Sequence, residues 1–389
     1  MKKQVLAFCL LSALVLSACH NATDAQEKNT PATSDSSPQP ATAVVDKTAF
    51  DDMDMPTITF GDSGYSSAPV AADADGFALD TTIHIRLFAK DKDSAKKAMR
   101  AAFSEVNRFN RIFSATTDSG EIARLNKTGE GTLSPEVLAL FDKALQVYDD
   151  TGGAYNVALY PVSQLWGFPT GDYHKPDEPA LQAALPLTNP HEVRVNPQTG
   201  NMRFTRAGMG LDFDGISQGA LSDRLMDVLQ DAGISSGLVN IDGNVQVLHR
   251  HPDKTDFRIG IQDPSNDTGY IGSVDVNNKA VITTGDYQRS FEADGKTWHS
   301  ILNPQTGMPA ENGLNSVSVI AQSGATASAL SRALYVLGPK EAIAYWQKHA
   351  KDFDMILYYK DGQVAVTGGI AKHYTANNRP QPDMITAES

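Results

Sequence analysis

Apolar and polar side chains recur with two different periods along the chain, which predicts both strands and helices. Residues 81–87 alternate between apolar and polar positions, as expected for a strand that buries one face. The next segment has apolar side chains at steps of three and four residues, which is typical of an amphipathic helix that Ser94 can cap. The apolar positions of this helix are Met99, Phe103, Val106, and Phe109 or Phe113. We therefore expect the folded part to begin near Phe77.

Capping and turn residues predict further helices and hairpins. One helix is expected to start at Ser134, with Pro135 in its first position and Gly152-Gly153 after its end. The other expected helices run from about Ser217 to Ala232, from Ala325 to Leu337 and from Lys340 to His349. Hairpins are expected around Asp242-Gly243 and Asp361-Gly362. Because helices and hairpins are mixed rather than alternating as strand–helix–strand units, we predict an α+β fold of layered sheets with packed helices.

The N-terminus has the pattern of an export signal. Lys2 and Lys3 precede a short apolar stretch, residues 5–16, which is too short to span a bilayer as a mature helix. Leu16-Ser17-Ala18-Cys19 follows, so we expect residues 1–19 to be a lipoprotein signal peptide ending at a lipidated Cys19. The alternative is an ordinary secretory signal with a chance cysteine. No aspartate directly follows Cys19, so we expect a cell-envelope lipoprotein that faces the periplasm from the outer membrane.

Composition separates a spacer from a globular part. Residues 20–75 are rich in small and polar side chains, and such a segment buries too little apolar surface to fold, so we expect a disordered tether. Residues 76–389 then form the domain. The chain has a formal net charge of −13 and no basic run, which argues against nucleic-acid binding. Its two cysteines, Cys9 and Cys19, both lie in the signal, so the domain has no thiol for catalysis or metal binding.

Small residues, turns and polar groups cluster in four segments of the predicted domain. One of them contains a glycine-bearing turn that enters the helix at Ser217, where free backbone N–H groups can bind a phosphate. The common nucleotide-binding, hydrolase and zinc-protease motifs do not occur in the sequence. The four segments are residues 152–161 with 165–168, residues 211–223, residues 283–287 with 299–307, and residues 327–338.

In their order and spacing these segments resemble the FAD:protein FMN transferase family, the ApbE-type flavin-trafficking lipoproteins. Residues 120–126, 239–243 and 259–264 resemble further stretches of that family, and the likeness extends over about residues 78–375. The resemblance implies an ApbE-like fold of mixed and antiparallel sheets. It also implies an enzyme that moves FMN from FAD to a Thr or Ser hydroxyl of an exported, flavin-accepting redox protein, with Mg²⁺ near the pyrophosphate.

The resemblance also implies which residues form the site. Gly215 would turn its carbonyl toward the metal, and the aromatic position of the family falls on Thr116. The residues that would contact the flavin nucleotide are Ala154, Tyr155, Asn156, Asp223 and Met226.

Several positions that hold metal-binding or catalytic residues in the family carry other residues in this chain. The metal-binding Asp and Thr fall on Ser328 and Arg332, and serine is a poor Mg²⁺ ligand whereas arginine is none. The catalytic positions of the family's HI-DP stretch fall on Ser300 and Asn303. Two functions therefore stay open: an active transferase, or a catalytically inactive relative that binds flavin nucleotide or a protein partner on the same scaffold.

Two local stretches of the sequence leave alternatives open. The guanidinium of Arg332 can take the place of Mg²⁺ and bind a pyrophosphate in its fork, or it can point into solvent. Residues 323–326 read Ser-Gly-Ala-Thr, which resembles the acceptor motif on which such enzymes place FMN. The same residues stand at a predicted helix start, where Ser and Thr cap backbone amides, and we favour capping.

Overall fold

The computed structural model describes residues 55–114 and 120–387. The predicted signal peptide, the lipidation of Cys19 and the flavin contact at Thr116 lie outside these ranges and stay predictions. None of the helices in the described ranges is both long and apolar enough to cross a membrane.

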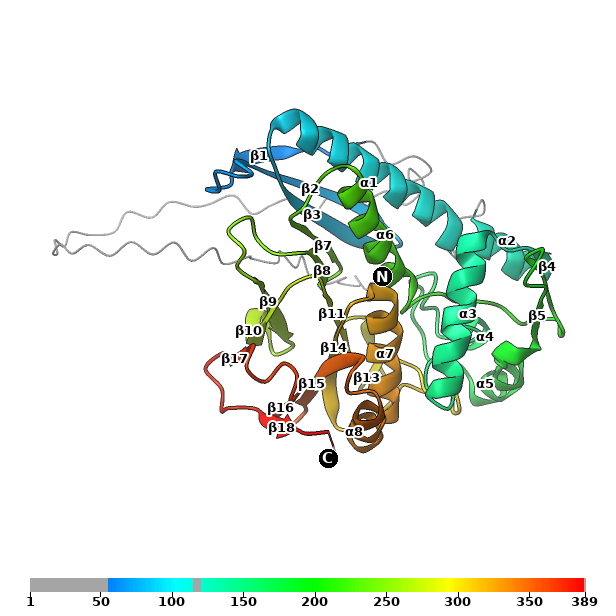
Figure 1. The fold of residues 1–389 in the computed structure, drawn as a ribbon. Coiled ribbons are helices and arrows are strands. Elements are labelled where there is room, and N and C mark those ends of the chain that lie inside the picture. Colours follow the sequence, from blue (N-terminus) through cyan, green and yellow to red (C-terminus); the bar gives the residue numbers. More distant parts are fainter. Residues whose placement is uncertain (1–54, 115–119, 388–389) are drawn as a thin grey trace, which may run out of the picture.

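A ten-stranded sheet forms the centre of the fold (Figure 1). Its neighbouring strands are antiparallel, except that the last two are parallel. In their order across the sheet the strands are β1 (Thr59–Asp62), β2 (Val70–Ala78), β3 (Thr81–Ala89), β7 (Gly237–Ile241), β8 (Asn244–Leu248), β11 (Ala280–Gly285), β14 (Leu314–Ala321), β15 (Phe353–Tyr359), β16 (Val364–Thr367) and β18 (Asp383–Ile385).

Helices cover one face of this sheet. Figure 1 shows α1, α6 and α7 lying along it, and each of them packs on the strands beneath. The main apolar core lies between the two layers and includes Phe103, Leu225 and Leu334. The helices are α1 (Lys92–Phe113), α2 (Glu121–Thr128), α3 (Pro135–Asp150), α4 (Tyr160–Leu165), α5 (Glu178–Ala184), α6 (Ser217–Asp231), α7 (Gly324–Leu337) and α8 (Pro339–Lys348), with short 3₁₀ turns at Leu185–Leu187 and Pro190–Glu192.

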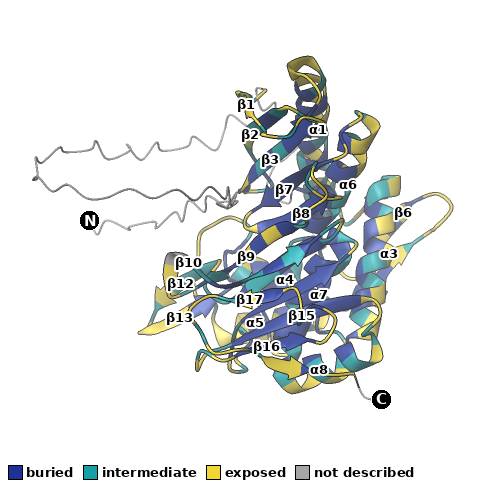
Figure 2. Cartoon of the chain, turned by 60° about the vertical axis from the view of Figure 1, so that its left-hand side comes forward, coloured by how far each residue is buried: buried dark blue, intermediate teal, exposed yellow. Residues whose placement is uncertain are grey.

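The other face of the sheet is covered by a second, three-stranded sheet, which consists of β17 (Tyr374–Ala376), β10 (Asn266–Val276) and β9 (Phe257–Asp263). Side chains alternate between the two cores: Ala280 and Ile282 of β11 belong to the helix side, whereas Val281 between them packs toward the second sheet. Because both faces are covered, β7 and β8 are buried along their whole length, and β15 is buried except at its last residue (Figure 2).

Two small sheets and a third apolar cluster complete the chain. The hairpin of β12 (Ser290–Ala293) and β13 (Lys296–His299) packs on the region of α4 through an aromatic cluster. Trp166 is its centre, with Trp298 and Phe168 beside it, and the Trp166 Nε1 donates to the carbonyl of Gly307 over 2.9 Å. The remaining strands, β4 (Glu130–Thr132), β6 (Asn201–Phe204) and β5 (Val193–Val195), form an outlying sheet.

The structure corrects two details of the sequence prediction. Asp91 caps α1 in place of Ser94, because its carboxylate accepts the backbone N–H of Ser94 at 2.7 Å. The folded part also begins earlier than residue 76, since β1 and most of β2 lie in the range expected to be tether. β2 is rich in alanine because small side chains fit beneath α1, and this composition resembles that of a spacer.

Candidate functional site

A cleft opens where the β2–β3 turn, the end of α1, the loop between α3 and α4 and the starts of several other elements meet. It encloses about 930 Å³ of empty space, part of which is open to solvent. All four segments singled out in the sequence contribute to its wall or to the elements behind it. The polar residues of the wall include Tyr155, Asn156, Asp212, Asp214, Arg289 and Arg332.

The loop that enters α6 supplies two carboxylates of the cleft, Asp212 and Asp214, and it is held in place from both sides. The Asn126 side chain binds the backbone of Leu211 twice: its Oδ1 accepts from the N–H at 2.7 Å and its Nδ2 donates to the carbonyl at 2.8 Å. The N–H of Asp212 donates to the carbonyl of Val157 over 2.7 Å. The loop therefore joins α2 to the segment after α3, and its carboxylates are fixed by backbone contacts.

Asp212 is a half-buried carboxylate of the cleft wall with a raised pKa. Its oxygens accept hydrogen bonds from the Ser163 hydroxyl and from the N–H of Asp214, both at 2.9 Å. Burial raises the pKa of Asp212, and the negative charge of Asp214 raises it further. Two hydrogen bonds thus hold the Asp212 carboxylate in place.

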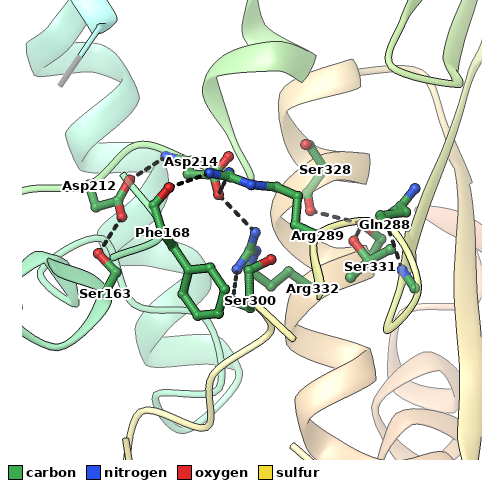
Figure 3. A network of polar contacts seen from close by, with 12 residues as sticks. Ser163, Phe168, Asp212, Asp214, Gln288, Arg289, Ser300, Ser328, Ser331 and Arg332 are labelled. Atoms are coloured by element: carbon green, nitrogen blue, oxygen red, sulfur yellow. Dashed lines mark hydrogen bonds and ion pairs between the residues drawn. The ribbon is translucent and has the colours of Figure 1, made fainter. Parts of the chain in front are cut away.

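One carboxylate oxygen of Asp214 accepts hydrogen bonds from two arginines (Figure 3). Its Oδ2 accepts from the Arg289 Nη1 at 2.9 Å and from the Arg332 Nη2 at 3.1 Å. Burial alone would raise the pKa of Asp214, but the two guanidinium groups outweigh it and lower the pKa. Asp214 is therefore an ionised carboxylate paired with two cations.

Arg332 lies in the wall of the cleft, and its side chain is only 20% exposed. Its Nη1 donates to the carbonyl of Ser300 over 3.0 Å. A Cβ placed on Gly215 would lie 2.5 Å from the Nε of Arg332, so glycine is needed there for space as well as for its φ of +80°. The alternative in which Arg332 points into solvent is wrong.

The residues at the implied metal positions do not fit Mg²⁺. A guanidinium lies directly against Gly215, whose carbonyl the resemblance turned toward the metal. Ser328 is buried in α7, where its carbonyl accepts from the Ser331 hydroxyl at 2.9 Å, and it is not part of the cleft wall. Among the residues that the structure describes, no group of three or more His, Cys, Asp or Glu side chains could hold a metal ion.

Three of the predicted flavin contacts, Ala154, Tyr155 and Asn156, do line the cleft. The Tyr155 hydroxyl is buried and has no hydrogen-bond partner within the described ranges, and burial raises its pKa. The Asn156 amide is used locally: it accepts from the N–H of Ala158 and donates to the carbonyl of Thr188, both at 2.8 Å. Asn156 thus shapes the wall, and Tyr155 brings a free donor close to it.

The other two, Asp223 and Met226, lie behind the cleft. The Asp223 carboxylate accepts from the Ser323 hydroxyl and from two backbone N–H groups at the start of α7, and Met226 is packed in the core. Ser323 in turn accepts from the N–H of Thr326 at 3.2 Å, which confirms it as the cap of α7.

Of the two positions that the resemblance implies are catalytic, only one lies in the cleft wall. Ser300 lines the cleft, next to Arg332. Asn303 lies in the turn that follows, where its Oδ1 accepts the N–H of Gln305 at 2.9 Å and its carbonyl accepts from Gly307 at 2.8 Å. Asn303 therefore has a structural role in this turn and is not part of the cleft wall.

Sequence reasoning missed Arg289 and the roles of the two aspartates. Arg289 follows the first part of the third segment by two residues, but its partner Asp214 is 75 positions away, so only the fold joins them. Asp212 and Asp214 lie inside the second segment, residues 211–223. An alternating Asp-Phe-Asp before a helix start was the available signal.

Comparison with known proteins points to one family. Residues 79–357 match the ApbE family, and this range contains the whole arginine–aspartate cluster. A FAD:protein FMN transferase of Klebsiella pneumoniae is 28% identical over 293 residues, which cover 74% of this chain and 89% of the relative. A second one, of Treponema pallidum, is 28% identical over 313 residues, or 75% of this chain and 85% of the relative.

Solved structures agree with the sequence matches. The ApbE protein of Thermotoga maritima superposes with a TM-score of 0.71 at 25% identity, over 76% of this chain and 96% of that one. The flavinyl transferase ApbE of Pseudomonas stutzeri, in its apo form, gives a TM-score of 0.67 at 25% identity, over 79% and 95% of the two chains. The predicted α+β class and ApbE-like fold are confirmed.

Proposed function

Since the chain belongs to the ApbE family, we propose that it is a FAD:protein FMN transferase, which moves FMN from FAD to a Thr or Ser hydroxyl of an acceptor protein. In this reaction the hydroxyl oxygen forms a bond to the FMN phosphorus. The hydroxyl gives up its proton to the solvent, the pyrophosphate bond breaks, and AMP leaves with the electron pair. The observation that carries the proposal is the family match across the whole cleft, from Leu79 to Arg332.

The residues of the cleft suit a phosphoryl transfer. Such a reaction depends on positioning and on compensation of negative charge, which oriented cations provide in a site that excludes water. Arg289 and Arg332 bring two guanidinium groups to one point of the wall. Because the implied metal positions do not fit Mg²⁺, we assign charge compensation to these side chains.

We also propose how the enzyme is placed in the cell. The signal at residues 1–19 and the lipidation of Cys19 would anchor it in the outer membrane, facing the periplasm. Its acceptor would then be an exported redox protein that carries FMN covalently. The support is the sequence pattern alone.

A second function is favoured by the substituted positions. Asn303 is used in a turn and Ser300 presents its carbonyl to Arg332, so neither supplies the chemistry that the family motif implies. A catalytically inactive relative that only binds flavin nucleotide would have this arrangement.

The deciding experiment incubates the full chain, purified in detergent, with FAD and an acceptor protein carrying a Ser-Gly-Ala-Thr segment. The intact mass of the acceptor is then measured, with and without Mg²⁺. We expect the mass of one FMN to be added, and none when the threonine of the acceptor is replaced by valine. An unmodified acceptor together with measurable FAD binding would instead establish the binding-only function. Absence of both would refute the two proposals.

A further inference from the structure

Two arginines share one ionised carboxylate in the wall of the cleft, which leaves the cluster with one surplus positive charge. Arg289 and Arg332 both donate to Oδ2 of Asp214. Of the other two carboxylates in the wall, Asp212 accepts from the Ser163 hydroxyl and from the N–H of Asp214, and Asp80 lies at the exposed rim. In the part of the chain that the structure describes, neither is ion-paired with these guanidinium groups. The two guanidinium groups therefore form a local cationic point at which an anion can bind.

Each guanidinium also has a second, neutral anchor. Arg332 donates to the carbonyl of Ser300 over 3.0 Å, and Arg289 donates to the carbonyl of Phe168 over 2.8 Å. The Nε of Arg332 is buried without a hydrogen-bond partner among the described residues. Because these anchors do not involve Asp214, both arginines keep their positions if another anion replaces its carboxylate.

We propose that this cluster is a metal-independent site for a pyrophosphate, and that Asp214 is a built-in anion which the pyrophosphate displaces from the arginines. The identity of the ligand as a dinucleotide rests on the proposed function. A guanidinium fork matches the geometry of phosphate oxygens and makes charge-assisted hydrogen bonds to them. A carboxylate left in place would repel the incoming phosphates, so binding and the Asp214 contacts exclude one another.

The test is calorimetric titration of the full chain with inorganic pyrophosphate and with ADP, in excess EDTA and again in Mg²⁺. We expect binding in EDTA with a Kd within about twofold of that in Mg²⁺. Arg332→Ala and Arg289→Ala should each weaken it by about tenfold or more, the loss typical of a charge-assisted hydrogen bond. Asp214→Asn should tighten it at least about threefold, because the competing charge is removed.

Two further variants control for misfolding and for general charge effects. Arg332→Lys keeps the charge but loses the fork, so we expect intermediate weakening. Arg258→Ala removes an exposed arginine, paired with Asp275 on the second sheet, and should leave the Kd unchanged. Thermal unfolding of each variant shows whether it is folded.

The possible outcomes separate this inference from the proposed function. If EDTA abolishes binding and Arg332→Ala binds like the wild type, the metal-independent site is refuted even where FMN transfer occurs. If Asp214→Asn weakens binding, displacement of Asp214 is refuted. If pyrophosphate binds through Arg332 in EDTA but no flavin is bound or transferred, the site stands and the proposed function fails.

Discussion

The backbone N–H of Gly324 donates to Oδ1 of Asp223 over 2.6 Å, so that the first turn of α7 is capped by a carboxylate of α6. The other oxygen of the same carboxylate accepts from the N–H of Ala325 at 3.0 Å and from the Ser323 hydroxyl at 2.8 Å. This one side chain satisfies orphan donors of a helix start and ties together the two helices that border the cleft.

Replacing Asp223 is therefore expected to destabilise the fold. Asp223→Ala leaves two backbone donors of α7 unpaired, and we expect the free energy of unfolding to fall by roughly 2–4 kcal/mol. Asp223→Asn keeps one acceptor and should cost about half as much. Urea unfolding followed by circular dichroism measures both. Unchanged stability together with lost FAD affinity would instead assign Asp223 to the ligand, as the family resemblance implies.

The contact between α6 and α7 also depends on a close approach of their backbones. A Cβ on Gly219 would overlap the carbonyl group of Gly324, so Gly219→Ala must push the helices apart. We expect a loss of about 1–3 kcal/mol, larger than the gain of about 0.5–1 kcal/mol from replacing a helical glycine. Gly61→Ala is the matched control: nothing lies within 4 Å of its Cβ. Equal melting temperatures for the two variants would contradict the close packing.

Trp166 anchors the aromatic cluster beside the cleft. Its side chain is 0% exposed, and its Nε1 donates to Gly307. Trp166→Ala should lower the free energy of unfolding by about 3–5 kcal/mol, through the cavity that it leaves. Trp166→Phe keeps a ring but leaves the Gly307 carbonyl without this donor. We expect it to lower the free energy of unfolding by about 1–3 kcal/mol. A Phe variant as unstable as the Ala variant would show that the hydrogen bond, rather than packing, dominates.

His84 on β3 predicts a pH dependence of stability. A hydrogen bond to Asp73 raises its pKa above the ordinary 6.5 against the effect of burial, and Asp75, 2.7 Å from Nδ1, adds to the rise. A raised folded-state pKa means that this stabilisation is complete below the unfolded-state pKa and is lost as the pH rises through the folded-state value.

The measurement compares the wild type with His84→Gln by urea unfolding on both sides of that range. At about pH 5.5 we expect the wild type to exceed the variant by a few tenths to about 1 kcal/mol, as is typical of a partly exposed ion pair. At about pH 8.5 most of this difference should vanish. A difference of the same size at both pH values would mean that His84 contributes by packing alone.

Local patterns were sufficient to predict most of the secondary structure. The hairpin of β7 and β8 turns at Asp242-Gly243, and α7 and α8 are separated at Gly338, as the turn residues indicated. The start of the fold was predicted too late, because the alanines of β2 are buried only through their pairing with β3 and their packing under α1. A composition rule cannot detect burial that depends on a neighbouring element.

Only part of the site could be predicted, because local segments can be recognised in the sequence and tertiary contacts cannot. Tyr155 and Arg332 were found because they lie in recognisable segments, and both line the cleft. Asp223 lies in such a segment as well, but its carboxylate faces α7. Arg289 carries no motif of its own, and its importance comes from sharing Asp214 with Arg332. Asp214 and Arg332 are 118 positions apart in the sequence. Contacts at such a separation are set by the tertiary structure.

The aromatic cluster gives the cleft an intrinsic tryptophan fluorescence signal. The ring centres of Trp166 and Trp298 are 5.3 Å apart, and Phe168 stacks on Trp166 while also lining the cleft. The third tryptophan of the chain, Trp346, is buried elsewhere, where it donates to the carbonyl of Phe353. Two of the three tryptophans therefore lie just behind the wall of the cleft. A flavin ring that enters the cleft would quench their fluorescence, so binding can be followed without a label.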